Sequence, residues 1–380
     1  MRCCLNSTSS FLRANRGHLS HRRAIKLTTR HIHVAGHPVA SIIHRGNPEG
    51  GIMRNVAFLR VLLFAGLASV LASILPTNAQ AELTTWVSGT GNDSNSSSGC
   101  QVTAPCRSVA TAISVTNPGG TVFCAGSTGS ALVIGSSLSI AQDVTIDCSQ
   151  GTLASPAGCE GGNAITINAG VKVTLRGLTI YSVDPPGCFP GSIGVDITAG
   201  ATVRIENCKI FGFSSAGVDV EPNSGLAVVK IQDSTITQNG GGVLVAPTGS
   251  ATVDFSIDRS RVESNNGGGV KTTTNVFEGQ INASISDTSL SFNSGNGVNV
   301  VSGSSAQSMM ALTRDIIALN GASGVQANGA TAGALVDTTL LDGNATGATA
   351  ALNGGRILTY GNNRIIGSAG SGFTSTTPLQ

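Results

Sequence analysis

Three acidic residues are the first candidates for chemistry, because an internal repeat would bring them together. Asp196 and Asp219 each follow a Gly-Val pair, and Glu221 lies two positions after Asp219. If the Gly-Val pairs are equivalent in neighbouring repeats, the aspartates stack, and strand alternation puts Glu221 on the same face. Carboxylates held this close repel one another, and Ca²⁺ prefers carboxylate oxygens as ligands. The sequence therefore offers either a Ca²⁺ site, the one cofactor it suggests, or a solvated acidic face.

Two aromatic and three charged residues form a second candidate, a patch that would bind sugars. Tyr181 and Phe211 occupy equivalent places one repeat apart, and Lys209, Arg261 and Glu263 are expected close to them. An aromatic ring gives a sugar an apolar surface, and charged tips hydrogen-bond its hydroxyl groups. The alternative is that the two rings form a hydrophobic contact beneath the proline-containing loop after Tyr181.

Opposite charges alternate at a third repeated position, occupied by Asp233, Arg259, Asp287, Arg314 and Asp337. One interpretation is an ionic groove for a charged polysaccharide. The other is a ladder of exposed ion pairs, each contributing only about 0–1 kcal/mol to stability. Alternation neutralises the stripe, so we expect the ladder to be structural.

The elements that position these side chains are short strands in a repeat of 23–30 residues. Each copy contains two or three β-type runs separated by Gly, Asn or Ser, with no room for a helix, which is typical of a solenoid. One inward column is expected at Leu175, Ile205, Ile231, Ile257, Ile285, Leu312 and Leu335. A second column, five residues later, is expected at Ile180, Ile210, Ile236, Val262, Leu290, Ile317 and Leu340.

Asparagines recur three residues after the second column, at Asn239, Asn265, Asn293 and Asn320. Asn tolerates the left-handed backbone of a tight turn, and stacked carboxamides can hydrogen-bond from coil to coil. A helix is expected within residues 104–115, and we place it as a cap over the first coil. Trp86, the single tryptophan, is expected to be buried in that coil.

The first 81 residues are predicted to be outside the fold. Residues 53–81 have a positive start, an apolar run and a final Ala-Gln-Ala, the pattern of a secretory signal peptide. Residues 1–52 are interpreted as a mis-assigned or disordered basic extension, with an organelle transit peptide as the alternative. This leaves residues 82–380 as one domain that is secreted or periplasmic, without a membrane span after cleavage.

Charge and histidine content exclude several functions for residues 82–380. They contain 12 Lys/Arg and 19 Asp/Glu, a net charge of −7, which does not favour a nucleic-acid partner. All six histidines lie in residues 1–52, so the predicted domain has no histidine base or metal ligand.

Export would allow the cysteines of this domain to form disulfides. Coil register predicts pairing of Cys100 with Cys106, of Cys124 with Cys148, and of Cys159 with Cys188. Cys208 falls at a small core position and is expected to be an inert thiol.

The segment WVSGTGNDSNSSSGC and the following APCRSVATAI resemble the start of right-handed parallel β-helix proteins of the pectate-lyase-like superfamily, and the closing YGNNRI is typical of small exported bacterial members. The resemblance extends from residue 84 to about residue 370. It implies an all-β fold, a single right-handed parallel β-helix (solenoid) with a short N-terminal cap helix. The Gly-His-Gly and Arg-Ile-Lys segments of polygalacturonase-like enzymes are absent, as is the Arg-x-Pro-x-x-Arg segment of pectate-lyase-like enzymes.

These observations favour an exported protein that binds polysaccharide or another cell-surface polymer without a recognisable catalytic motif. A polysaccharide lyase or glycoside hydrolase with an unrecognised site is one alternative. A structural rod of the cell envelope is another. The sequence does not indicate an oligomeric state.

Overall fold

The computed structural model describes residues 82–125, 137–149, 154–157, 162–182, 190–274, 279–303 and 305–377. All of them belong to the second of two units into which the chain divides, Met1–Leu75 and Pro76–Gln380. The expectations for residues 1–52 and 53–81, and for a Cys159–Cys188 disulfide, therefore lie outside the described residues.

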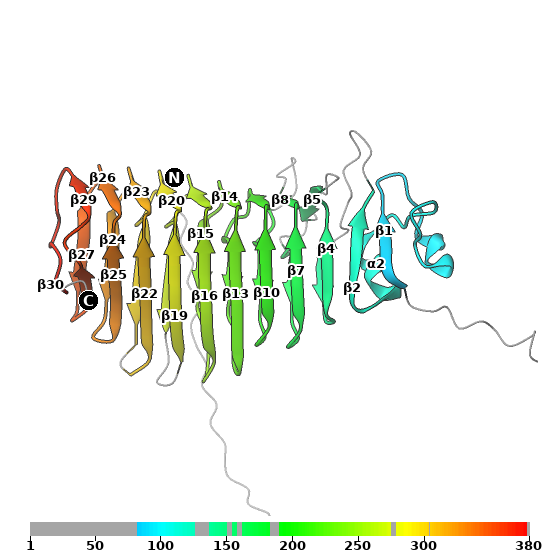
Figure 1. Cartoon of the computed structure of the whole chain (residues 1–380), viewed down its shortest axis with the longest axis horizontal. Coiled ribbons are helices and arrows are strands. Elements are labelled where there is room, and N and C mark those ends of the chain that lie inside the picture. Colours follow the sequence, from blue (N-terminus) through cyan, green and yellow to red (C-terminus); the bar gives the residue numbers. More distant parts are fainter. Residues whose placement is uncertain are drawn as a thin grey trace, which may run out of the picture. The chain divides into compact units, whose positions relative to one another are not determined.

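Three parallel sheets make up the described unit, and their strands stack side by side along it (Figure 1). Sheet A has 12 strands: β1 Glu82–Val87, β2 Thr116–Cys124, β4 Val144–Asp147, β7 Lys172–Arg176, β10 Thr202–Glu206, β13 Leu226–Gln232, β16 Thr252–Asp258, β19 Gln280–Ser286, β22 Gln307–Thr313, β25 Ala332–Asp337, β28 Arg356–Thr359 and β30 Ser375–Thr376.

Sheets B and C have nine strands each. Sheet B contains β3 Leu138–Ile140, β6 Ile165–Ile167, β9 Ile193–Ile197, β12 Ala216–Val220, β15 Gly241–Val245, β18 Val270–Thr274, β21 Val298–Ser302, β24 Ser323–Asn328 and β27 Gly347–Leu352. Sheet C contains β5 Ala154–Ala157, β8 Thr179–Ser182, β11 Lys209–Phe211, β14 Thr235–Thr237, β17 Arg261–Glu263, β20 Ser289–Ser291, β23 Ile316–Ala318, β26 Leu340–Asp342 and β29 Arg364–Ile366.

Each typical coil crosses sheet A, then C, then B, and every strand pairs in parallel with its equivalents in adjacent coils. Strand residues alternate between the interior and the outer face, so one inward column buries an apolar side chain per coil. Burying each such Ile, Leu or Val contributes roughly 1.5–3 kcal/mol. The predicted parallel β-solenoid is therefore confirmed.

The two predicted inward columns are confirmed over their first six members, from Leu175 to Leu312 and from Ile180 to Ile317. The seventh member of each was wrong by one residue. Leu312 pairs with Val336 rather than Leu335, and Ile317 pairs with Leu341 rather than Leu340. Two apolar residues are adjacent in β25 and again in β26, so the sequence pattern could not distinguish which of the two points inward. A one-residue shift in register moves a side chain to the opposite face.

The predicted asparagine ladder is present and has a fifth member, Asn344. The side-chain Nδ2 of each Asn donates to Oδ1 of the Asn in the next coil at 2.9–3.2 Å, from Asn239 through Asn320. The expected left-handed backbone was assigned to the wrong residue. The residue before each Asn has positive φ instead, as at Phe292 (59°) and Leu319 (54°).

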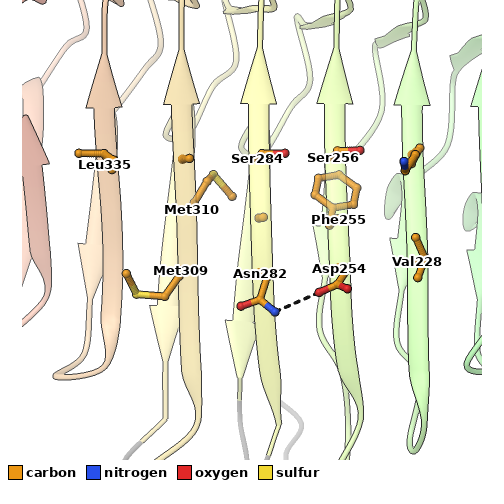
Figure 2. Close-up of a pocket in the computed structure, with 12 residues that line it drawn as sticks. Val228, Asp254, Phe255, Ser256, Asn282, Ser284, Met309, Met310 and Leu335 are labelled. Atoms are coloured by element: carbon orange, nitrogen blue, oxygen red, sulfur yellow. Dashed lines mark hydrogen bonds between the residues drawn. The ribbon is translucent and has the colours of Figure 1, made fainter. Parts of the chain in front are cut away.

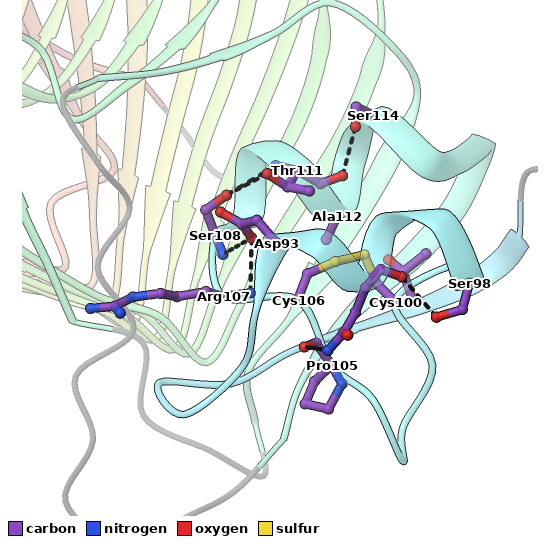
Figure 3. The surroundings of a disulfide bond; sticks show 12 residues. Asp93, Ser98, Cys100, Pro105, Cys106, Arg107, Ser108, Thr111, Ala112 and Ser114 are labelled. Carbon is purple, nitrogen blue, oxygen red and sulfur yellow. Dashed lines mark hydrogen bonds between the residues drawn. A yellow bond between two sulfur atoms is a disulfide. The ribbon is translucent and has the colours of Figure 1, made fainter.

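At the start of the solenoid, helix α2 (Val109–Val115) packs against β1 and β2, and helix η1 (Asp93–Ser98) packs against α2. Figure 3 shows Asp93 accepting hydrogen bonds from the backbone amides of Arg107 (2.9 Å) and Ser108 (2.8 Å). Helix α2 buries Val109 and two neighbouring apolar side chains, as its sequence pattern predicts. That α2 caps the solenoid stays a prediction.

The expectation that Trp86 is buried was wrong. Trp86 is only partly buried and stacks on Phe123 of the next sheet A strand, with 5.0 Å between ring centroids. Its strand neighbours Thr85 and Val87 take the interior positions, so strand alternation turns the indole to the outer side.

Two of the predicted disulfides are present, Cys100–Cys106 and Cys124–Cys148, with Cα atoms 5.0 and 4.7 Å apart. The second bond joins adjacent coils. Cys208 is free and buried, as expected. These bonds fit an oxidising compartment. No helix among the described residues is long and apolar enough to cross a membrane.

Candidate functional site

The predicted sugar-binding residues do lie together, on the outer face of sheet C. Tyr181 and Phe211 are paired residues of β8 and β11, with ring centroids 5.4 Å apart and planes 11° from parallel. The Lys209 ammonium lies 5.0 Å from the Phe211 ring centroid. Each ring therefore covers one face of the other, and the Lys209 ammonium lies over the Phe211 ring. The contacts with Tyr181 and Lys209 reduce the flat surface of Phe211 on which a sugar could stack.

The remaining two members of that patch are tied to each other. Arg261 donates to Glu263 from Nη2 at 2.5 Å, and Ser289 donates to the other oxygen of Glu263 at 2.7 Å. Thr235 lies between Lys209 and Arg261 in the same outward column. The five residues share one face, but two of their charges already have partners within the protein.

The acidic trio is partly assembled on sheet B. Asp196 and Asp219 are paired residues of β9 and β12 and are only 4% and 6% exposed. Burial, with the charge of Glu221 as the second cause, raises the pKa of Asp196 to about 6 and that of Asp219 to about 7. Asn163 donates to Asp196 Oδ2 at 2.7 Å.

One oxygen of each of these aspartates has no hydrogen-bond partner among the described residues. Within that same part of the chain, no three His, Cys, Asp or Glu side chains gather in a way that could hold a metal ion. Ca²⁺ binding at this pair stays a prediction.

The alternating charges form separate ion pairs at the corner between sheets A and C. Arg259 pairs with Asp233 at 3.0 Å, and Arg314 pairs with Asp287 at 2.6 Å. Asp337 was assigned to this ladder wrongly, because the register of β25 places it opposite Thr313.

A hollow also lies on the outer side of sheet A, and none of its lining residues is among the site residues predicted from the sequence. It has a volume of about 650 Å³ and crosses β13, β16, β19, β22 and β25 (Figure 2). We call it the sheet A trough. Its lining residues are Val228, Lys230, Asp254, Phe255, Ser256, Asn282, Ala283, Ser284, Met309, Met310, Ala311 and Leu335.

A change in side-chain size along one outward column explains the trough. Paired positions in successive coils carry Lys230, then Ser256, Ser284 and Ala311, then Leu335. Three small side chains thus lie between two long ones. Neighbouring coils are about 4.8 Å apart, so the shallow stretch extends for three coils along the solenoid axis.

Both polar and apolar groups line the trough. Asn282 donates to Asp254 across adjacent strands at 3.0 Å, and the Ser256 and Ser284 hydroxyls lie on the neighbouring column (Figure 2). Met309 is 42% exposed and, with Leu335, makes the downstream end apolar. The signal for this site was available in the repeat, as a run of small residues at an outward strand position, but none of those residue types indicates chemistry alone.

Comparison with known proteins supports the fold. The family described as right handed beta helix region matches residues 87–278, and the chain belongs to it. No curated protein matches the chain.

Similar solved structures include pectate lyase Pel9A, with 15% identity, a TM-score of 0.47, and coverage of 77% of this chain and 78% of that one. A double mutant of the periplasmic alginate epimerase AlgG has 13% identity, a TM-score of 0.38, and coverage of 70% and 78%. A rhamnogalacturonan lyase has 10% identity, a TM-score of 0.35, and coverage of 72% and 75%. These are similarities to known structures, and none assigns an activity to this chain.

Proposed function

We propose that this β-helix protein is exported and binds a linear polysaccharide along the sheet A trough. The observation that carries the proposal is the run of Ser256, Ser284 and Ala311 between Lys230 and Leu335, which opens a channel parallel to the stacking direction. Sugars present hydroxyl groups and apolar C–H faces together. A channel lined by hydroxyl, carboxamide and thioether groups matches both.

Binding is favoured over hydrolysis by the composition of the trough. Asp254 is the one carboxylate among the described residues that line it. Glycoside hydrolysis ordinarily needs two carboxyl groups on opposite sides of the scissile bond. A lyase mechanism would need a base at the sugar ring. Among the described residues that line the trough, Lys230 is the single basic side chain, and it lies at the upstream end.

A pair of variants tests the proposal and separates it from the sheet C patch. Ser284→Trp fills the trough, whereas Thr235→Trp places the same side chain between Lys209 and Arg261 on sheet C. Binding of the purified protein to a panel of acidic and neutral polysaccharides is measured by affinity electrophoresis and calorimetry. We expect Ser284→Trp to abolish binding and Thr235→Trp to retain it.

The reverse result would place the site on sheet C. Failure of the unaltered protein to bind any polysaccharide would favour a structural rod. Release of new reducing ends or unsaturated products from a bound polymer would show catalysis.

A further inference from the structure

Two large apolar side chains occupy a turn position at which neighbouring coils carry glycine or a polar residue. The residue before each ladder asparagine has positive φ, and in successive coils it is Gln238, Ser264, Phe292, Leu319 and Gly343. A left-handed backbone is unfavourable for a large side chain, because its Cβ crowds the following carbonyl oxygen. Phe292 is 58% exposed and Leu319 is 50% exposed, so burial within the chain does not explain them. Strained positions of this kind indicate a role beyond the packing of the chain itself.

The same two coils have a distinct outer face on sheet C, where β20 and β23 lie side by side (Figure 1). Their outward side chains are Ser289 and Ser291 in β20, and Ile316 and Ala318 in β23. Ile316 is 47% exposed, and the other three are small. A hollow of about 380 Å³ at the corner of sheets A and C is lined in part by Ser289 and Ile316. Apolar surface of this kind marks a contact with another molecule.

Opposite charges flank this face at its other edge. Asp287 precedes β20 and Arg314 precedes β23, and the two form an ion pair at 2.6 Å. Their side chains are still 38% and 55% exposed, so a second molecule can reach both charges. Each of the two coils therefore carries one large apolar side chain at one edge of sheet C and one charge at the other edge.

We propose that this face binds a second copy of the chain about a two-fold axis that runs parallel to the strands, between β20 and β23. Rotation about such an axis keeps the strand direction and reverses the order of the coils, so β20 of one protomer lies opposite β23 of the other. Phe292 then meets the partner's Leu319, and Arg314 meets the partner's Asp287. In a two-fold contact each pair occurs twice. The inference does not depend on the proposed function, because the contact is on sheet C and the trough is on sheet A.

Charge order and side-chain size favour a second copy over another partner. An antiparallel copy presents an anion to Arg314 and a cation to Asp287, whereas a partner surface of one sign would be repelled by one of them. It also places Ile316 opposite the partner's small Ser289. A two-fold axis along the solenoid would instead bring Phe292 against the partner's Asp287 and desolvate that carboxylate.

The first test is the mass of the purified protein, measured by sedimentation equilibrium and light scattering at concentrations up to about 100 µM. We expect a dimer that dissociates on dilution. Phe292→Ser with Leu319→Gly introduces residue types that this turn carries in neighbouring coils, and it should weaken the dimer by at least about a hundredfold without unfolding the protein. Leu226→Ser with Leu352→Ser is the control, because these side chains are 50% and 44% exposed on sheets A and B. It should change the dissociation constant by less than about threefold.

The second test uses charge to check the two-fold arrangement. Asp287→Arg gives the face two cations per protomer, and Arg314→Asp gives it two anions. Each variant should remain largely monomeric by itself, because like charges then meet across the axis. A mixture of the two should form a heterodimer, since every cation then lies opposite an anion. Native mass spectrometry distinguishes the heterodimer from either homodimer, and circular dichroism checks that each variant is folded.

Every outcome decides the proposal. A monomer at all concentrations overturns it, as does a dimer that persists in Phe292→Ser with Leu319→Gly or is equally weakened in the control. Masses that grow beyond the dimer exclude a closed two-fold contact. Failure of the two charge variants to form a heterodimer overturns the antiparallel arrangement.

Discussion

The side chain of Asn293 donates from Nδ2 to Oδ1 of Asn320 in the next coil, 3.0 Å away, and both residues are 1% exposed. Asn320 Oδ1 also accepts from the backbone amide of Asn293 at 3.1 Å. The same two bonds link Asn265 to Asn293. One buried carboxamide per coil thus satisfies the backbone and connects neighbouring coils.

Replacing Asn293 by Ala should destabilise the protein by on the order of 3 kcal/mol, because buried donors and acceptors on both neighbouring coils lose their partner. Urea unfolding at equilibrium measures the change. Asn266→Ala, at an exposed position in the preceding coil, is the matched control and should cost less than about 0.5 kcal/mol. Similar losses in the two variants would show that the ladder contributes no special stability.

Gly269 should not tolerate alanine, since a Cβ there would lie 2.5 Å from the Gly297 carbonyl oxygen and 2.9 Å from Asn293 Nδ2. We expect Gly269→Ala to lower the free energy of unfolding by about 1–3 kcal/mol through overpacking. At Gly241 the nearest atom would be 3.4 Å away, an ordinary contact, so Gly241→Ala should be close to neutral. Thermal unfolding of both proteins checks the difference.

Asp315 should make the protein less stable as pH rises from about 4 to 7. It is 1% exposed, one oxygen accepts from the Thr288 amide at 2.9 Å, and the other has no partner among the described residues. Burial raises the pKa of Asp315 from 3.8 to about 7. The folded state therefore keeps a proton that the unfolded chain releases within this range, so the free energy of unfolding falls as pH rises.

Asp315→Asn is neutral at every pH and should reduce the loss of stability between pH 5 and pH 8. The buried Asp196 and Asp219 have raised pKa values as well and leave a residual effect in the same direction. Asp287→Asn is the control. The hydrogen bond from Arg314 lowers the pKa of the exposed Asp287. Replacing Asp287 should therefore not diminish the fall in the free energy of unfolding between pH 5 and pH 8. An unchanged pH profile in Asp315→Asn would exclude Asp315 as its source.

The arginines at the corner of sheets A and C should matter little to stability. Arg259 and Arg314 are 54% and 55% exposed, and water screens their pairs with Asp233 and Asp287. Changing both to Gln should alter the free energy of unfolding by less than about 1 kcal/mol per pair and leave polymer binding intact. Loss of binding in this double variant would identify the corner as a site.

If the pair Asp196 and Asp219 binds Ca²⁺, the ion should raise the melting temperature by preferential binding to the folded state. Calorimetry with and without Ca²⁺ measures the shift, and Asp219→Asn should lose it. A melting temperature of the unaltered protein that does not respond to Ca²⁺ would end the hypothesis and leave a buried acidic pair.

The repeat determined most of the fold without a structure. From Leu175 to Leu312 one apolar residue recurs between polar neighbours, so only one register buries it. That register predicted six members of each inward column and the Cys124–Cys148 bond between adjacent coils. Where Leu335 and Val336 are adjacent, either residue satisfies the pattern, and the contacts of β25 with β22 selected Val336.

The candidate site was decided by tertiary structure. Tyr181 and Phe211 were identified by residue type and do stack, but only their geometry shows that each ring covers the other. Ser284 and Leu335 have no chemical signal of their own, and Leu335 was even assigned to the interior. They form a trough because stacking places the small side chains of three coils in line between longer ones. The depth of the surface depends on the difference in size between side chains that are neighbours in space but more than twenty residues apart in the sequence.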